Sequence, residues 1–234
     1  MIKFNNKTFE NISDLIYIED IVVSPISLEP TVRARPVQFG SEFVRMSGGT
    51  RNITISFALL DIDINERQAL IQDIRDWAFT TTEKTMQLPM YEDRHLECIC
   101  TQFPDDTYRK WWENKLKLVF TCFNNPYWTS DELIEVRTGT TFSIGGSAPP
   151  LMTIERSGST KLMHQTFASK TESMTFSEIP AGSLVINLNR QTAAIGSTSI
   201  MKYYANDSTW IVPKVGANQV ISGVGTVKYR ERWV

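Results

Sequence analysis

The 234-residue sequence is poor in the residue types from which most metal and thiol sites are built. Its two histidines, His95 and His164, have no second imidazole and no Cys-x-x-Cys pair at the spacing of metal ligands. Cys98 and Cys100 are too close along one strand for an unstrained disulfide, which leaves Cys122 without a partner. We therefore expect no metal site and three reduced, buried thiols.

Neither sign of charge dominates, because 24 Lys and Arg stand against 26 Asp and Glu and give a net charge of −2. Such a chain has no long-range attraction to nucleic acid phosphates. It has no run of about 18 apolar residues that would span a membrane, and residues 1–7 lack the apolar segment of a secretory signal. We expect a protein that is made in a cytoplasm and contacts no membrane.

Motifs of catalysis are also missing. The glycine pairs at 48–49 and 145–146 lack the Lys-Ser/Thr of a P-loop, and no Gly-x-Ser-x-Gly elbow occurs. The acidic pairs at 92–93 and 105–106 lie beside turn-like segments, which is typical of solvated turn residues. The sequence predicts neither an enzyme nor a cofactor.

One amphipathic helix is predicted over residues 65–79. Asn65 is a good N-cap residue, and Gln68 completes a capping box. An apolar stripe follows at a spacing of three to four residues, formed by Leu70, Ile71, Ile74, Trp77 and Ala78. We expect Leu70, Ile74 and Trp77 to anchor this helix on a sheet.

The rest of the chain has the alternation and the turn residues of β-strands. In the first half, strands are predicted at 1–4, 15–23, 52–60, 85–103 and 110–123. Residues 129–150 are rich in Ser, Thr and Gly, which predicts a domain boundary. Beyond it, strands are predicted at 151–156, 174–179, 184–188, 200–204, 210–212 and 224–234, with a turn at 216–218. We expect a first domain at 1–130, a linker at 131–150 and a small antiparallel sandwich at 151–234.

Residues 33–51 form a segment that we call the arm. Its Pro and Gly residues interrupt regular pairing, it is low in core residues, and its four arginines oppose a single acid, Glu42. This composition predicts a protruding, locally basic hairpin.

Aromatic residues occur in adjacent pairs, for example Tyr127-Trp128 and Tyr203-Tyr204. Because neighbours in a strand point to opposite faces, one member of each pair faces away from the core. Exposed aromatic residues beside arginines are enriched at protein interfaces, which favours an oligomer contact. A sugar-stacking platform, with Trp210 as its aromatic residue, is the less favoured alternative.

Three features together resemble the distal tail protein (Dit) family of siphophages. The first is the strand Thr50-Arg51-Asn52-Ile53-Thr54-Ile55-Ser56-Phe57 followed by the helix. The second is the strand 115–123 with the stop Asn124-Asn125-Pro126-Tyr127, and the third is the C-terminal half with its Pro149-Pro150 opening and its ending Gly225-Thr226-Val227-Lys228-Tyr229-Arg230-Glu231-Arg232-Trp233. Together these features cover nearly the whole chain.

The resemblance implies a mainly β fold: an N-terminal, tail-tube-like β-sandwich with one packed helix, and a C-terminal, galectin-like antiparallel β-sandwich. It also implies a structural protein of the virion, located at the phage tail tip after assembly in the host cytoplasm. Six copies would form a ring between tail tube and tip or baseplate, with DNA only in transit through its channel. The implied partners are other copies of the chain, the tail tube protein, the hub or tip protein, and receptor-binding or baseplate proteins.

The resemblance also implies that the arm reaches a neighbouring subunit. The implied interface residues are Arg33, Arg35, Phe39, Phe43, Arg45 and Arg51. Two alternatives stay open: a carbohydrate-binding host-adhesion module that uses the C-terminal sandwich, and another tail component such as a tube or hub protein.

Overall fold

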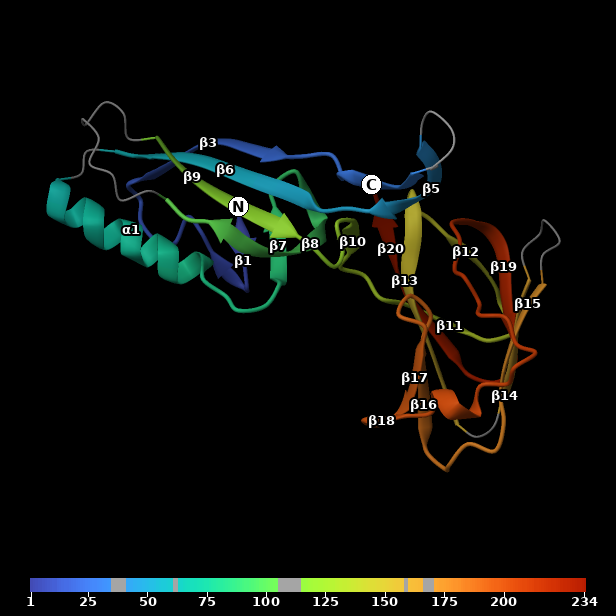
Figure 1. Cartoon of the computed structure of the whole chain (residues 1–234). Helices are drawn as coiled ribbons and strands as arrows, with labels where there is room; N and C mark the ends of the chain where they lie inside the picture. The colour runs from blue at the N-terminus through green and yellow to red at the C-terminus, as the bar shows by residue number, and fades with distance from the viewer. Residues whose placement is uncertain (35–40, 61–62, 105–114, 158–159, 166–170) are drawn as a thin grey trace. The chain divides into compact units, whose positions relative to one another are not determined.

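The computed structural model describes residues 1–34, 41–60, 63–104, 115–157, 160–165 and 171–234, and for residues 28–34, 41–48, 64, 157, 160, 164, 165 and 171 it describes the backbone alone. These residues form two compact units, Met1–Trp128 and Thr129–Trp233. The fold is mainly β, and α1 (Ile64–Ala78) is the one α-helix within the described ranges (Figure 1). The mainly β fold with a single helix that the sequence predicts is confirmed. No helix formed by the described residues has both the length and the apolar character needed to cross a membrane.

The first unit is built on antiparallel strands that pair in the order β3–β6–β9–β8–β7–β1–β2. The long strand β8 pairs with β7 through residues 91 and 96–98 and with β9 through residues 99–102, so it joins the part β3–β6–β9 to the part β7–β1–β2. The bounds are β1 (Lys3–Phe4), β2 (Lys7–Thr8), β3 (Ile16–Val23), β6 (Arg51–Leu59), β7 (Lys84–Leu88), β8 (Tyr91–Gln102) and β9 (Lys115–Cys122).

Helix α1 begins earlier than predicted, and its N-cap is Asp63 rather than Asn65. A carboxylate oxygen of Asp63 accepts the backbone N–H of Asn65 at 2.7 Å and that of Glu66 at 3.0 Å. Asn65 is therefore already inside the first turn, where its own N–H needs a cap. The predicted apolar stripe, in contrast, is confirmed, since Leu70, Ile71, Ile74, Trp77 and Ala78 are all buried.

Trp77 anchors α1 on the strands. Its ring lies 5.7 Å from that of Phe4 on β1, 4.8 Å from Phe9 and 6.0 Å from Phe120 on β9, measured between centroids. Phe9 in turn packs edge-on against Phe57 of β6. This aromatic cluster joins the helix to three strands of the first unit.

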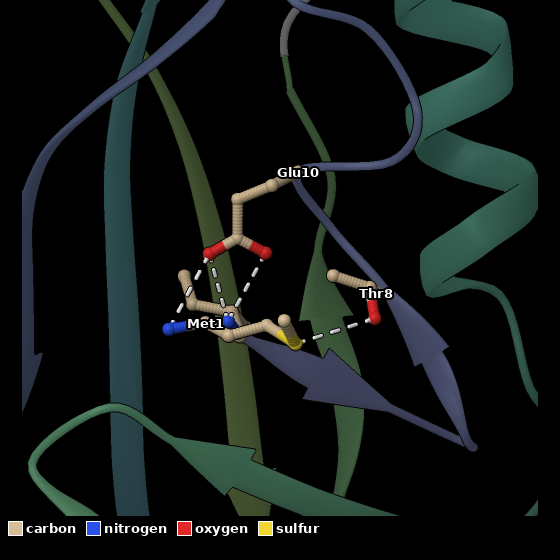
Figure 2. A network of polar contacts seen from close by, with 4 residues as sticks. Met1, Thr8 and Glu10 are labelled. Carbon is tan, nitrogen blue, oxygen red and sulfur yellow. Dashed lines mark hydrogen bonds and ion pairs between the residues drawn. The ribbon is translucent and has the colours of Figure 1, made fainter.

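The N-terminal segment is held by a polar network at Glu10 (Figure 2). The two carboxylate oxygens of Glu10 accept the backbone N–H of Ile2 at 2.9 and 3.1 Å. Thr8 Oγ1 lies 3.7 Å from Met1 Sδ. These contacts fix the start of β1 next to the segment that follows β2.

The second unit is a sandwich of two antiparallel sheets around one apolar core (Figure 1). One sheet has the order β18–β17–β16–β13–β20–β11, and the other has the order β12–β19–β14–β15. Their buried residues, such as Ile154 and Leu184 from the first sheet and Leu162 and Ile221 from the second, meet in that core. The bounds are β11 (Ile134–Arg137), β12 (Thr141–Ile144), β13 (Ala148–Ser157), β14 (Thr160–Gln165), β15 (Thr171–Phe176), β16 (Ser183–Asn187), β17 (Thr192–Ile195), β18 (Thr198–Ser199), β19 (Gly216–Ser222) and β20 (Thr226–Trp233).

Several predicted segments differ from the structure in this half of the chain. Residues 131–150, predicted to be a linker, hold β11, β12 and the start of β13, because their alternating apolar residues face the core; β10 (Trp128–Ser130) precedes them. Residues 200–204 contain a 3-10 turn, η2 (Met201–Tyr203), and residues 210–212 form no strand. The predicted turn at 216–218 is the first part of β19.

Candidate interaction surfaces

The described part of the arm belongs to a backbone hairpin that begins a few residues before it. Strands β4 (Leu28–Ala34) and β5 (Ser41–Gly48) pair antiparallel, from Leu28 opposite Gly48 to Ala34 opposite Ser41. They form a two-stranded sheet of their own. The predicted hairpin is confirmed for this part of the arm, whereas Arg35 and Phe39 lie outside the described residues.

The base of the arm is fixed by contacts between Ser27 and Thr50. The Ser27 N–H donates to the Thr50 carbonyl oxygen at 2.9 Å, and the Thr50 N–H donates to Ser27 Oγ at 3.0 Å. Only glycine fits at Gly49, because a Cβ there would lie 1.8 Å from the Ser27 carbonyl oxygen. The two chain segments therefore leave the first unit in close contact.

The predicted interface residues do not form one group. The backbone places Arg33 opposite Glu42, Phe43 opposite Val32 and Arg45 opposite Thr31 within the hairpin. Their side chains lie outside the description, so their role in an interface stays a prediction.

The prediction that Arg51 is an interface residue is wrong. It is the first residue of β6, whose alternate residues from 51 to 59 face inward, and its side chain is only 4 % exposed. Burial lowers the pKa of the Arg51 guanidinium, and the neighbouring ionisable groups are Cys122, Tyr127 and Tyr91. A side chain so enclosed has no surface to offer a neighbouring subunit.

The outer strand β3 is an interaction surface that the sequence analysis did not identify. Among the described strands it pairs with β6 alone, so its other edge carries unpaired backbone groups. Tyr17 and Val22 on β3 are 58 % and 50 % exposed. The alternation of β3 is visible in the sequence, but its position at the edge is set by strand order, which a single sequence does not give.

A cavity of about 540 Å³ lies between the N-terminal strands and α1. Its lining includes Asp73, Asp76 and Trp77 from the helix, with Lys7 and Asn11 from the N-terminal segment. Within the described ranges, no group of three or more His, Cys, Asp or Glu side chains is arranged to hold a metal ion. The lining offers polar contacts and no recognisable chemistry.

The contacts of Trp210 within the second unit give this residue a structural role. Its indole nitrogen donates to the Leu188 carbonyl oxygen at 3.0 Å, and its ring packs on Tyr204 and Phe176. The nearby side chain of Asn189 is also engaged, since its oxygen accepts from Met152 N and its nitrogen donates to Pro150 O, both at 2.7 Å. These polar groups support the sandwich itself, which leaves the carbohydrate-binding alternative without a described site.

Comparison with solved structures shows the fold of a known protein. The Dit protein of phage SPP1, described as a paradigm of the hub adsorption apparatus in phages that infect Gram-positive bacteria, matches with a TM-score of 0.75 at 14% identity, over 100% of this chain and 98% of that chain. The baseplate of phage P2, in its activated conformation with Ca, gives a TM-score of 0.45 at 8% identity, over 94% and 91% of the two chains. The same baseplate with Sr gives 0.43 at 8%, over 93% and 90%. These two likenesses are too weak to argue from.

Comparisons of sequence add nothing to this result, because no protein-family model and no curated protein matches the chain. The likeness to SPP1 Dit therefore shows a shared fold over the whole chain, in two units.

Proposed function

We propose that this protein is a structural, non-enzymatic subunit of a phage tail. Six copies form a ring that joins the tail tube to the tail tip or baseplate, and DNA passes through the channel of the ring. The observation that carries the proposal is the fold shared with the SPP1 Dit protein over nearly the full length of both chains. The near-neutral net charge of −2 supports it, since a conduit must not bind the DNA that slides through it.

In this proposal the two units have different tasks. The first unit, which is tail-tube-like, forms the ring and contacts the tail tube protein and the hub or tip protein. The second unit, a galectin-like sandwich, holds receptor-binding or baseplate proteins on the outside. The chain is assembled in the host cytoplasm and is located at the tail tip of the virion.

A closed ring needs two different surfaces on each subunit, one that meets each neighbour. The arm supplies one candidate, because β4 and β5 form a hairpin separate from the other described strands. The edge strand β3 supplies the other, because Tyr17 and Val22 expose apolar surface next to unpaired backbone groups. We expect the ring contact to bury both the apolar side chains of β3 and its unpaired backbone groups.

Native mass spectrometry of the full chain tests this proposal. Wild type is expected to give six copies, and the double variant Tyr17→Lys/Val22→Lys is expected to give a folded single copy, because lysines on an edge strand prevent strand addition. The matched control is Val185→Lys on β16 of the second unit, a valine that is 39 % exposed and should leave the ring intact. A wild-type protein that stays a single copy at high concentration would contradict the ring. A double variant that still forms rings would exclude β3 from the contact.

A further inference from the structure

Three inward-facing side chains on neighbouring strands lie in one row inside the first unit. Arg51 on β6 is directly opposite Cys122 on β9. On the other side of β9, Ile99 and Cys100 of β8 pair with Thr121 and Phe120, and the pairing ends at Ile99 and Thr121. The next residues along the two strands are Cys98 and Cys122, whose side chains are hydrogen-bonded to each other. Cys98 and Cys122 are fully buried and Arg51 is 4 % exposed.

The two thiols are neighbours. Directly opposed residues on one face of an antiparallel pair have Cβ atoms about 4.5–5.5 Å apart. Burial raises the pKa of the Cys98 thiol well above its ordinary value, and its hydrogen bond with the Cys122 thiol raises it further. Disulfides span a Cα–Cα distance of about 4.4–6.8 Å, so this pair can be bridged with little movement of the backbone.

Cys100 has a different environment. It lies opposite Phe120, and its Sγ donates to the Gln102 carbonyl oxygen at 3.4 Å. It is two residues from Cys98 on the same strand, where the two side chains point the same way and their Cβ atoms lie roughly 6.6 Å apart, wider than the about 3.5–4.5 Å that a disulfide spans. Of the three possible pairings, the structure favours Cys98 with Cys122.

Arg51 makes the surroundings of Cys122 different from those of Cys98. Among the described residues, its Nε and Nη1 atoms have no hydrogen-bond partner although both are buried. Leaving a buried donor unsatisfied is costly, and a guanidinium is charged at every ordinary pH. Its neighbour across the strand pair is Cys122. The Cys122 sulfur is the acceptor that the register places opposite the Arg51 side chain.

We propose that Cys98 and Cys122 are a buried dithiol that hydrogen peroxide converts into a cross-strand disulfide, with Arg51 as a positioning residue for the Cys122 sulfur. The Cys122 sulfur attacks one oxygen of the peroxide and gives up its proton, the O–O bond breaks, and the released hydroxide takes up that proton and leaves as water. The Cys98 sulfur then attacks the Cys122 sulfenic acid, the S–O bond breaks, and the hydroxide leaves with the Cys98 proton as a second water. Both sulfurs are oxidised, and both peroxide oxygens are reduced.

The bridge would link β8 to β9 across the segment 99–121. Closing such a segment reduces the conformational entropy of the unfolded chain, so the first unit should resist unfolding better after oxidation. This inference is independent of the proposed function, since it depends only on the register and burial of the first unit.

The experiment treats the reduced full chain with hydrogen peroxide and then counts free thiols in denaturant. We expect the number of free thiols to fall from three to one. Tryptic mass mapping without a reductant should then detect the peptide 95–109 linked to the peptide 118–137, and adding a reductant should separate the two peptides. Three thiols lost without this link, a link between two copies, or thiols that stay reduced when those of the unfolded chain react, would each overturn the proposal.

Variants identify the sulfurs and the role of Arg51. Cys100→Ser should keep the link between the two peptides and Cys98→Ser should abolish it; the reverse result would contradict the assignment. Arg51→Met should slow formation of the link by on the order of tenfold, and Arg51→Lys should restore part of the rate. An unchanged rate in Arg51→Met would exclude the positioning role. If a variant fails to fold, the wild-type mapping still shows whether Cys122 is linked to the peptide 95–109.

Discussion

The indole nitrogen of Trp77 donates a hydrogen bond of 3.1 Å to the carbonyl oxygen of Lys7, and this bond ties helix α1 to strand β2. The same side chain packs on Phe4, Phe9 and Phe120. Trp77 therefore combines a large apolar contact with one directional bond, and the two contributions can be measured separately.

Trp77→Phe should cost about 1–3 kcal/mol of unfolding free energy, because the ring contacts largely remain while the Lys7 carbonyl loses its donor. Trp77→Ala should cost about 3–5 kcal/mol, because it also leaves a cavity among the aromatic rings. Urea unfolding followed by far-ultraviolet circular dichroism measures both. Equal losses in the two variants would show that the hydrogen bond, rather than the packing, dominates.

The N-cap of α1 gives a second prediction. Asp63→Ala should destabilise the first unit by about 1 kcal/mol, because the N–H groups of Asn65 and Glu66 lose their acceptor. Asn65→Ala is the control and should change stability by only a few tenths of a kcal/mol. If the Asn65 variant were the more damaging one, the helix would begin two residues later than the structure places it.

Buried thiols predict a loss of stability at high pH. Burial raises the pKa of Cys98 well above the ordinary value of 9.0 and raises the pKa of Cys100 to about 12. Above about pH 9 the unfolded chain releases these protons and the folded chain keeps them. Their stabilising contribution is therefore complete below pH 9 and is lost as the pH rises towards the folded values, by up to about 1.4 kcal/mol per pH unit and thiol.

Urea unfolding in the presence of a reductant at about pH 8 and about pH 10.5 checks this prediction. The double variant Cys98→Ala/Cys100→Ala should show a shallower decline than wild type. Burial also raises the pKa values of Tyr204 and Tyr229, but these groups are common to both proteins and cancel in the comparison. Parallel declines would show that the thiols do not stay protonated in the folded chain.

Gly49 predicts a link between the base of the arm and assembly. Gly49→Ala would place a methyl group 1.8 Å from the Ser27 carbonyl oxygen, so the two segments must separate, at a cost of about 1–3 kcal/mol. We expect fewer rings by native mass spectrometry. Gly139→Ala is the control, since its Cβ meets no atom within 4 Å although its φ of +84° adds local strain. If the two variants assembled equally well, the conformation at the base of the arm would not affect ring formation.

The sequence predicted most of the first unit because its pattern is strongly periodic. The stripe from Leu70 to Ala78 has helical spacing and is buried, and the alternation in β6 is confirmed from Ile53 to Leu59. The exact N-cap was wrong because Asp63 and Asn65 are both good capping residues, and only backbone geometry distinguishes them.

The second unit was harder to predict, since short strands there pair across long stretches of sequence. Residues 134–137 pair with residues 226–229, so a segment that looked like a linker is a strand. Residues 210–212 look like a strand, but the Val212 N–H donates to the side-chain carboxylate of Glu172 on β15 rather than to a backbone carbonyl oxygen. Such long-range pairing is not encoded in local periodicity.

Predicting the candidate sites depended on strand register even more than predicting the fold did. Composition marked the arm as basic, but it did not show that Arg51 faces inward. Sequence spacing left Cys122 without a partner, whereas the pairing of β8 with β9 ends at Ile99 and Thr121 and brings the adjacent Cys98 and Cys122 side chains into hydrogen-bonding contact. Both facts follow from strand pairing, and a one-residue shift of register would reverse each of them.

Negative-stain electron microscopy of the purified full-length protein tests the central proposal most directly. The account predicts rings with six-fold symmetry and a central hole, formed by wild type and lost in Tyr17→Lys/Val22→Lys. Isolated single copies at every concentration, or assemblies without a central hole, would contradict it.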